Sequence, residues 1–419
     1  MTSDAPQAYV WVWLPAVDTP VVAGLLRRDA RGGYGFAYGR SYLAREDAIS
    51  LFPDELPLQP GEQRQRDDGL PSCLRDAAPD AWGRRVIINR LFAGGVGSDM
   101  ARLELDDLTY LLESGSDRIG ALDFQTSASA YRPRESRQDS LDVLSDAANR
   151  LDRGEPLSPE LTLALQHGTS IGGARPKALL TSDTGQFIAK FSTSQDLYNL
   201  VKAEYVAMRL ASLVGLDAAK VTLSQALGRD VLLVERFDRS RHGSGWQRRG
   251  MLSALTLLGL NEMEARYASY EDLAHRVRRD FADARRTLEA LYGRMVYNIL
   301  CGNTDDHARN HAAFWDGRDY RLTPAYDICP QGRTGGEASQ AMLLIGQRRD
   351  SRLAACLAAA PVFGVTLDAA RSLIDHQTAV IEREWEFVCD QAGLSRPERR
   401  ALWGRQFLNP YCFEGYPTA

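Results

Sequence analysis

Cysteine and histidine are scarce in this chain of 419 residues, with six of each, and no two cysteines form a C-x-x-C pair. This scarcity argues against both a zinc cluster and a disulfide framework, so we expect a reducing, cytoplasmic setting. An excess of basic charge is also missing, and the net charge of -5 argues against a protein that holds nucleic acid mainly through its phosphates. The apolar stretch at residues 354–365 is too short and interrupted to span a bilayer, so no membrane contact is expected.

The composition that is present fits a globular chain of two or three packed units. Hydrophobic residues make up 44% and charged residues 25%, which are ordinary globular proportions. At 419 residues the chain exceeds the size at which a single hydrophobic core keeps growing. A polar stretch poor in large apolar side chains predicts a linker around one helix. We therefore divide the chain into an N-terminal subdomain, this linker, a middle part and a helical C-terminal part: residues 1–125, 126–160, 161–239 and 240–419.

The N-terminal subdomain is expected to be rich in β-strands. Residues 9–14 (YVWVWL) are dense in β-forming side chains, and residues 33–38 (GYGFAY) predict a second short strand after a glycine turn. Further on, residues 79–83 (PDAWG) open a short helix over residues 84–92, and we assign its apolar side chains to packing alone.

Residues 168–177 (GTSIGGARPK) form a loop of small residues that ends with two cations. Small residues let backbone N–H groups approach phosphate oxygens, and Arg175 and Lys177 can neutralise the charge of those oxygens. The loop matches neither a P-loop nor a G-x-G-x-x-G motif, so it is either a phosphate-binding loop or an ordinary glycine turn. The segments that follow decide between the two.

Those segments place a lysine on a strand and a glutamate on a helix. Residues 187–191 (FIAKF) alternate as a strand, with Ile188 and Lys190 on the same side. Lys190 either reaches ATP phosphates or is an edge lysine that discourages aggregation. A helical stripe over residues 200–214 follows, and Glu204 beside it either orients the lysine or is an ordinary exposed glutamate.

Residues 231–238 (VLLVERFD) combine an apolar run with a charged end. This pattern is typical of a strand that leaves a hydrophobic core. We predict a hinge between two lobes at this point.

The strongest chemical signal lies in residues 303–310 (NTDDHARN), which follow a helical apolar stripe. Asp305 and Asn310 have the D-x-x-x-x-N spacing of a kinase catalytic loop, in which Asp accepts the substrate hydroxyl proton and Asn holds Mg²⁺. Residues 314–320 (FWDGRDY) read as a β-hairpin with an Asp-Gly turn that leads to Asp327. Kinases place a second metal ligand after such a hairpin, so Asp327 is predicted to bind Mg²⁺.

A serine hydrolase is the enzymatic alternative, because residues 168–172 (GTSIG) satisfy the G-x-S-x-G nucleophile elbow with Ser170 as the nucleophile. Such an elbow requires a strand before the serine and a helix after it. The sequence instead predicts a helix over residues 159–166 and strands after Pro176, which disfavours the hydrolase.

Together these segments resemble the HipA family of toxin kinases from toxin–antitoxin modules, from the N-terminal unit to the C-lobe. The similar segments are PDAWG, DRIGAL, SIGGARPKALL, FIAKF, ERFDR, NTDDHARN and PAYD, at residues 79–83, 117–122, 170–180, 187–191, 235–239, 303–310 and 324–327. The resemblance implies an α+β, two-lobed protein-kinase-like fold with a small β-rich N-terminal subdomain and a mostly helical C-lobe. It also implies transfer of the γ-phosphate of ATP to a protein serine or threonine.

The resemblance assigns roles to individual positions. Asp305 is expected to be the catalytic base, Asn310 and Asp327 to hold Mg²⁺, and His307 to support the catalytic loop beside ATP. Lys190 is expected on the phosphates, and the backbone of Glu235 and Phe237 at adenine. The ATP-binding residues expected in all are Gly172, Gly173, Ala174, Arg175, Lys177, Lys190, Glu235, Phe237 and His307.

Regulation and partners also follow from the resemblance alone. Ser170 occupies the position that the family autophosphorylates, which would expel the loop and silence the kinase. Family members pair with a helix-turn-helix, HipB-like antitoxin, so this chain would contact DNA only indirectly. The expected target is a protein, with an aminoacyl-tRNA synthetase as the example, whose phosphorylation leads to growth arrest and persistence. The non-enzymatic alternative is an inactive kinase-like partner in a repressor complex, and the intact Lys190, Asp305 and Asp327 argue against it.

Overall fold

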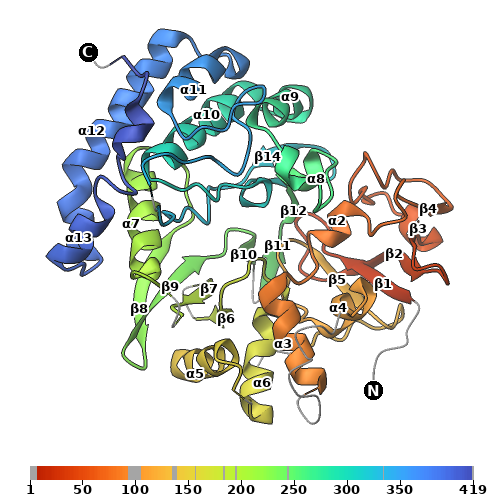
Figure 1. Ribbon diagram of the computed structural model, residues 1–419. Coiled ribbons are helices and arrows are strands. Elements are labelled where there is room, and N and C mark those ends of the chain that lie inside the picture. Colours follow the sequence, from red (N-terminus) through yellow and green to blue (C-terminus); the bar gives the residue numbers. More distant parts are fainter. Residues whose placement is uncertain are drawn as a thin grey trace.

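The computed structural model describes residues 7–92, 105–134, 139–155, 157–182, 185–193, 196–242, 245–333 and 335–417. These residues build a β-rich N-terminal region, a four-stranded sheet flanked by helices, and a mainly helical C-terminal region (Figure 1). Within the described ranges, no helix is both long enough and apolar enough to cross a membrane.

The N-terminal region is an antiparallel five-stranded sheet in the order β4-β3-β2-β1-β5. Ala8, Val10 and Val12 alternate along β1 and are fully buried or nearly so, which explains why this run forms a strand over a core. The two strands expected at residues 9–14 and 33–38 are confirmed as β1 and β3. The elements are β1 (Gln7–Val12), β2 (Val21–Arg28), β3 (Tyr34–Tyr38), α1 (Arg40–Leu43), β4 (Glu62–Gln63), α2 (Ser72–Arg75), α4 (Asp107–Glu113) and β5 (Leu122–Gln125).

The second sheet is antiparallel and has the order β6-β7-β9-β8. One face of its strand β7 carries Ala189 and Phe191, which are buried in a separate core, while Ile188 and Lys190 lie on the other face and line a cavity. This is the alternation expected from the sequence. The strands are β6 (Lys177–Thr181), β7 (Gln186–Phe191), β8 (Val221–Ala226) and β9 (Arg229–Glu235).

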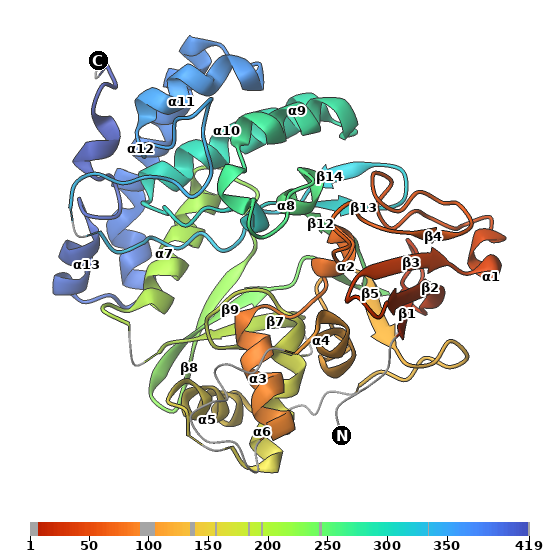
Figure 2. The ribbon, with the colours of Figure 1, turned by 45° about the vertical axis from the view of Figure 1, so that its right-hand side comes forward.

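Three helices that precede this sheet in the sequence pack against it: α3 (Ala81–Phe92), α5 (Leu141–Asp152) and α6 (Pro159–Gln166). Both views show α3 beside α6, below the N-terminal sheet (Figures 1 and 2). The stretch predicted as a linker thus contributes α5, whose apolar face is buried, to the core of this lobe. The proposed boundaries at residues 126 and 160 therefore enclose a packed helix, and α3 crosses from the N-terminal region into the next core.

The C-terminal region is mainly helical, as expected. Its three-stranded sheet has the order β12-β13-β14, with Gly317 at φ 93° in the predicted Asp-Gly turn, and β10 pairs with β11 beside it. The elements are α7 (Leu200–Leu213), β10 (Arg239–His242), β11 (Gly245–Arg248), β12 (Gly250–Ser253), α8 (Ala254–Leu257), α9 (Tyr270–Asp280), α10 (Ala284–Leu300), β13 (Ala312–Trp315), β14 (Tyr320–Leu322), α11 (Leu353–Ala359), α12 (Leu367–Gln391) and α13 (Arg396–Leu402).

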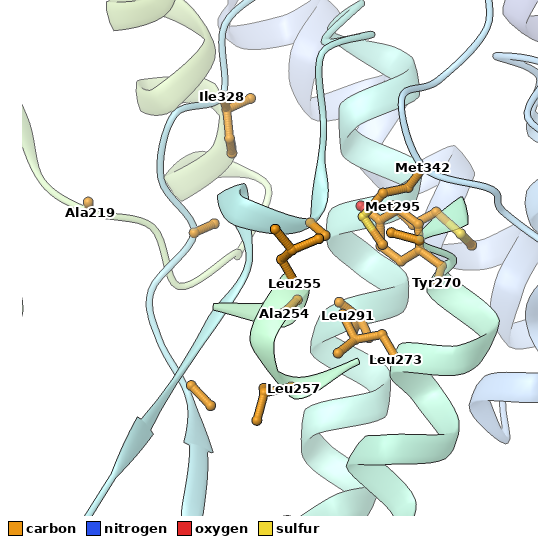
Figure 3. Close-up of a cluster of buried hydrophobic side chains, with 14 of the residues drawn as sticks. Ala219, Ala254, Leu255, Leu257, Tyr270, Leu273, Leu291, Met295, Ile328 and Met342 are labelled. Carbon is orange, nitrogen blue, oxygen red and sulfur yellow. The ribbon is translucent and has the colours of Figure 1, made fainter. Parts of the chain in front are cut away.

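Helix α10 is the central support of this region. The Asp283 side chain caps its first turn by accepting from Arg286 N, and its apolar side chains are buried against α8 and α9 (Figure 3). Gly302 ends it at φ 74°, where a Cβ would lie 2.5 Å from the carbonyl oxygen of Gln406. Because the motif predicted to be catalytic, residues 303–310, follows directly, this core fixes where that motif begins.

Candidate active site

One cavity of about 690 Å³ lies where the four-stranded sheet, the C-terminal region and the N-terminal region meet. Its wall gathers segments that are more than two hundred residues apart in the sequence. Most of the predicted site residues line it: Gly172, Gly173, Lys177, Lys190, Glu235, Phe237, His307, Asn310 and Asp327. The wall of this cavity does not include Ser170, Ala174, Arg175, Glu204 or Asp305.

Lys190 lines the cavity and pairs with two carboxylates. Its Nζ lies 2.5 Å from Glu204 Oε1 and also donates to Asp327 Oδ1. Burial lowers the pKa of Lys190, but the carboxylates of Asp327 and Glu204 outweigh burial and raise it above the ordinary lysine value. Strand β7 lies between β6 and β9, so Lys190 is not an edge lysine. Glu204 is 6% exposed, so it is not the exposed surface residue that was the alternative.

Asp327 follows β14 and faces Lys190 across the cavity. Its φ of 57° lies in the left-handed region, which a non-glycine residue adopts at a cost in backbone energy and which is common at functional sites. The charge of Lys190 lowers the pKa of Asp327 to about 2, so this carboxylate is ionised at neutral pH. The neighbouring Tyr326 donates its hydroxyl to the Arg309 carbonyl oxygen at 2.6 Å, which ties this segment to the catalytic loop.

The predicted catalytic loop, residues 303–310, is supported by a buried polar cluster. Asp306 accepts from the Tyr270 hydroxyl and lies 2.8 Å from His311 Nε2, and all three residues are buried. Asn310 Nδ2 donates to the carbonyl oxygen of Asp305 at 3.3 Å, which closes the loop between the two predicted site residues. His311 thus supports the loop, while His307 lines the cavity, and the loop support expected from the His307 side chain stays a prediction.

Asp305 is exposed, in contrast to its neighbours on the loop. Although the residue is exposed, its carboxyl group is partly desolvated, which raises the pKa of Asp305; His307 opposes this effect, while the negative charges of Asp327 and Asp306 add to it. The Asp305 side chain is therefore within electrostatic reach of Asp327 and His307, although it does not line the cavity.

Asn310 and Asp327 fit the chemistry of a magnesium ion. Asn310 Oδ1 and the second carboxylate oxygen of Asp327 have no hydrogen-bond partner among the described residues, and both side chains line the cavity. Oxygen donors of this kind are the ligands that Mg²⁺ takes, usually one or two from the protein together with substrate phosphates. Within the part of the chain that the structure describes, no group of three or more His, Cys, Asp or Glu side chains forms a metal cluster.

Part of the cavity wall is aromatic and lies at the predicted hinge. The Phe237 ring is 6.0 Å from the ring of Phe314 and 5.6 Å from that of Tyr326. The Phe237 amide donates no hydrogen bond to any described residue, although this segment follows directly from β9. An apolar slot with a free backbone donor can take a flat heterocycle such as adenine.

The glycine loop lies at the cavity through Gly172 and Gly173. Lys177, which is 4% exposed, donates to the carbonyl oxygen of Gly172, and burial together with the charge of Lys190 lowers its pKa to about 8. Arg175 instead pairs with both carboxylate oxygens of Asp196, at 2.9 and 2.7 Å, and does not line the cavity. Its expected contact with ATP, like that of Ala174, stays a prediction.

Ser170 is 2% exposed and donates to the carbonyl oxygen of Asp117 at 3.4 Å. Helix α6 and a 3₁₀ turn precede it, and β6 follows it. A nucleophile elbow needs a strand before the serine and a helix after it, so the order here is the reverse of what a hydrolase requires. The serine hydrolase alternative is therefore wrong.

Sequence reasoning missed several residues of the cavity wall. Tyr326 and Arg309 lie inside motifs that were noticed, but only the Asp and Asn of those motifs were interpreted. Asp80 was assigned to a packing segment, yet its side chain also reaches the cavity. The sequence did contain a signal for Asp80, since it follows a proline at the start of a helix. An aspartate at a helix start is well placed to accept hydrogen bonds from backbone N–H groups.

Comparisons with known proteins agree with this arrangement. The chain is 26% identical over 329 residues to the putative kinase Y4mE of Sinorhizobium fredii, covering 73% of this chain and 74% of that protein. It is 27% identical over 187 residues to the serine/threonine-protein kinase toxin HipA of Shewanella oneidensis, covering 38% of this chain and 42% of the toxin.

The solved structure of a Shewanella oneidensis HipA, HipB and operator DNA complex contains a chain that matches with a TM-score of 0.71 at 19% identity, covering 97% of both chains. The predicted α+β, two-lobed, kinase-like fold is thereby confirmed. The HipA N-terminal domain family matches residues 12–125, and the HipA-like C-terminal domain family matches residues 169–385, more than half of the chain. The chain belongs to the HipA family.

Proposed function

We propose that this chain is the serine/threonine-protein kinase toxin of a toxin–antitoxin module and transfers the γ-phosphate of ATP to a protein hydroxyl. The observation that carries the proposal is the single cavity into which Lys190, Asn310, Asp327 and the glycine loop converge. Phosphoryl transfer requires an ion-paired lysine, two oxygen ligands for a metal ion, and a loop whose backbone can come close to the phosphates.

Each part of the cavity has a place in the reaction. The aromatic slot at Phe237 takes adenine, and Lys177 and Lys190 neutralise the phosphates. Asn310 and Asp327 would hold Mg²⁺, which neutralises charge on the β- and γ-phosphates when bound. The substrate hydroxyl oxygen attacks the γ-phosphorus, the bond from that phosphorus to the β–γ bridging oxygen breaks, ADP leaves, and Asp305 accepts the hydroxyl proton.

The exposure of Asp305 supports a large acceptor. An exposed base that does not line the cavity can meet a hydroxyl on the surface of another protein while ATP stays inside the cavity. We propose a protein serine or threonine as the acceptor, with an aminoacyl-tRNA synthetase as the first candidate to test. Because the Shewanella oneidensis structure was solved with HipB and operator DNA, we propose a helix-turn-helix antitoxin as the partner through which this chain meets DNA.

Self-modification at Ser170 is part of the proposal. The hydroxyl is buried and hydrogen-bonded to Asp117, so the loop has to leave its present position before Ser170 can reach a catalytic base. Phosphate added there would carry two negative charges into a buried site and prevent the loop from returning.

The test is incubation of the purified protein with γ-labelled ATP and Mg²⁺, followed by mass spectrometry of labelled residues. Label on the wild type, including on Ser170, is the expected result. A wild type that binds ATP, is not phosphorylated beforehand and acquires no label would contradict the kinase and favour an inactive partner in a repressor complex.

Nucleotide affinity is predicted to fall as the pH rises through the pKa of Lys177. Burial lowers that pKa to about 8, so the lysine loses the charge that attracts phosphates within an accessible pH range. The dissociation constant of an ATP analogue, measured by fluorescence from pH 7 to 9.5, should increase over this range. Lys177→Arg keeps its charge and should show a flat profile, and an equally flat wild type would refute the assignment of Lys177 to the phosphates.

A further inference from the structure

The glycine loop is held both by contacts within its own lobe and by residues 80–82 at the start of helix α3. Three hydrogen bonds join the loop at residues 169–177 to helix α3. Gly173 N donates to Asp80 Oδ2 at 2.6 Å, Gly173 O accepts from Trp82 N at 3.4 Å, and Trp82 Nε1 donates to the Lys177 carbonyl oxygen at 3.0 Å. Further along, Gly115 N donates to Thr169 Oγ1 at 3.0 Å.

The approach of α3 to the loop is as close as backbones allow. A Cβ on Gly83 would lie 1.9 Å from the Thr169 carbonyl oxygen, and a Cβ on Gly172 would lie 2.9 Å from Asp80 Oδ2. Position 83 therefore requires glycine, whereas a side chain at position 172 would require the Asp80 carboxylate to shift. Such contact fixes the distance between loop and helix.

Asp80 is itself rigidly placed. Its carbonyl oxygen accepts from Arg84 N at 2.9 Å in the first turn of α3. Trp82, two residues later, is fully buried in the core formed with the four-stranded sheet, including Ala189 and Phe191. The Asp80 carboxylate cannot follow a moving loop unless the start of α3 unwinds.

The charge of Asp80 is directed at the nucleotide site. The side chain lines the cavity and lies close enough to interact electrostatically with Lys177 and with Arg309 of the catalytic loop. It therefore meets the glycine loop, a phosphate-binding lysine and the catalytic loop at one point.

We propose that Asp80 is a positioning residue for ATP: by accepting from the Gly173 amide it holds the glycine loop in the geometry that receives the phosphates. The N-terminal region thereby supplies a side chain that the nucleotide site needs, although Asp80 lies ninety residues before the loop. The inference rests on the proposed kinase function, because it assigns a purpose to the same cavity.

The experiment compares wild type, Asp80→Ala, Asp80→Asn and the exposed control Asp18→Ala as full-length proteins. Amide hydrogen exchange across residues 168–176 is measured without nucleotide, and the dissociation constant of a fluorescent ATP analogue is measured with Mg²⁺. We expect Asp80→Ala to exchange faster in the loop and to bind the analogue about tenfold more weakly. Asp80→Asn, whose amide oxygen accepts the same hydrogen bond, should stay within about threefold of wild type, as should Asp18→Ala.

Each outcome decides a different point. If Asp80→Ala has the same amide exchange rates in the loop and the same affinity for the analogue as wild type, the contact between Asp80 and Gly173 contributes only to packing, and the inference is overturned. Tighter binding in both Asp80 variants would show that the carboxylate repels the phosphates, which also overturns it. A wild type that binds no nucleotide would refute the proposed function, and the positioning role of Asp80 would be refuted with it. If the wild type does bind the analogue, a difference in affinity between wild type and the Asp80 variants tests the role of Asp80 alone.

Discussion

Replacing Asp305 with asparagine is expected to lower the rate constant of phosphoryl transfer by about 10²–10⁴-fold, the usual contribution of a positioned general base. The KM for ATP should stay within about threefold of the wild-type value, because Asp305 is outside the cavity wall and makes no contact needed for nucleotide binding. Asparagine keeps the size of the side chain but cannot take a proton. The measurement is steady-state kinetics with a protein acceptor, combined with equilibrium binding of ATP.

The matched control is the adjacent Asp306, whose carboxylate is buried and occupied by Tyr270 and His311. Asp306→Asn should lower the free energy of unfolding by weakening that cluster, whereas Asp305→Asn should leave stability nearly unchanged because the side chain is exposed. Loss of activity with loss of stability in both variants would mean that Asp305 is structural. Retained phosphoryl transfer in Asp305→Asn would assign the base elsewhere.

Local patterns predicted the elements around the site well. The alternation at residues 187–191 fixed both the strand and the face that carries Lys190. The apolar helical stripe before residue 303 predicted the end of α10 correctly, and the sequence also predicted the Asp-Gly turn between β13 and β14. These features depend on a few neighbouring residues, so periodicity and turn chemistry suffice.

Long-range contacts could not be predicted in the same way. Glu204 had two equal interpretations in the sequence, because only the fold shows that α7 turns it toward Lys190. The sequence did not reveal that Arg175 pairs with Asp196, a contact that only the fold shows. Asp80 belongs to a helix that leaves the N-terminal sheet to pack on a different lobe, and no local pattern reports such a crossing.

Replacing Lys190 with methionine is expected to abolish detectable phosphoryl transfer and also to destabilise the fold. The lysine separates the carboxylates of Glu204 and Asp327, and without it Glu204 is left buried beside a second negative charge. Removing one partner of a buried ion pair costs about 3–5 kcal/mol of unfolding free energy. Urea unfolding of the variant beside the wild type measures this loss.

A second substitution and a change of pH can show whether that loss of stability comes from the missing charge or from lost packing. Burial already raises the pKa of Glu204, and removal of Lys190 takes away the charge that lowers it, so the folded variant binds a proton that the unfolded chain releases. A group whose pKa is raised in the folded state stabilises at low pH, so Lys190→Met should regain stability as the pH falls from 8 to 5. Adding Glu204→Gln should restore stability at pH 8 but leave phosphoryl transfer absent, because the phosphates still lack their cation. An equal stability loss at both pH values, with no rescue by Glu204→Gln, would show that the lysine stem supports the fold by packing and not by charge.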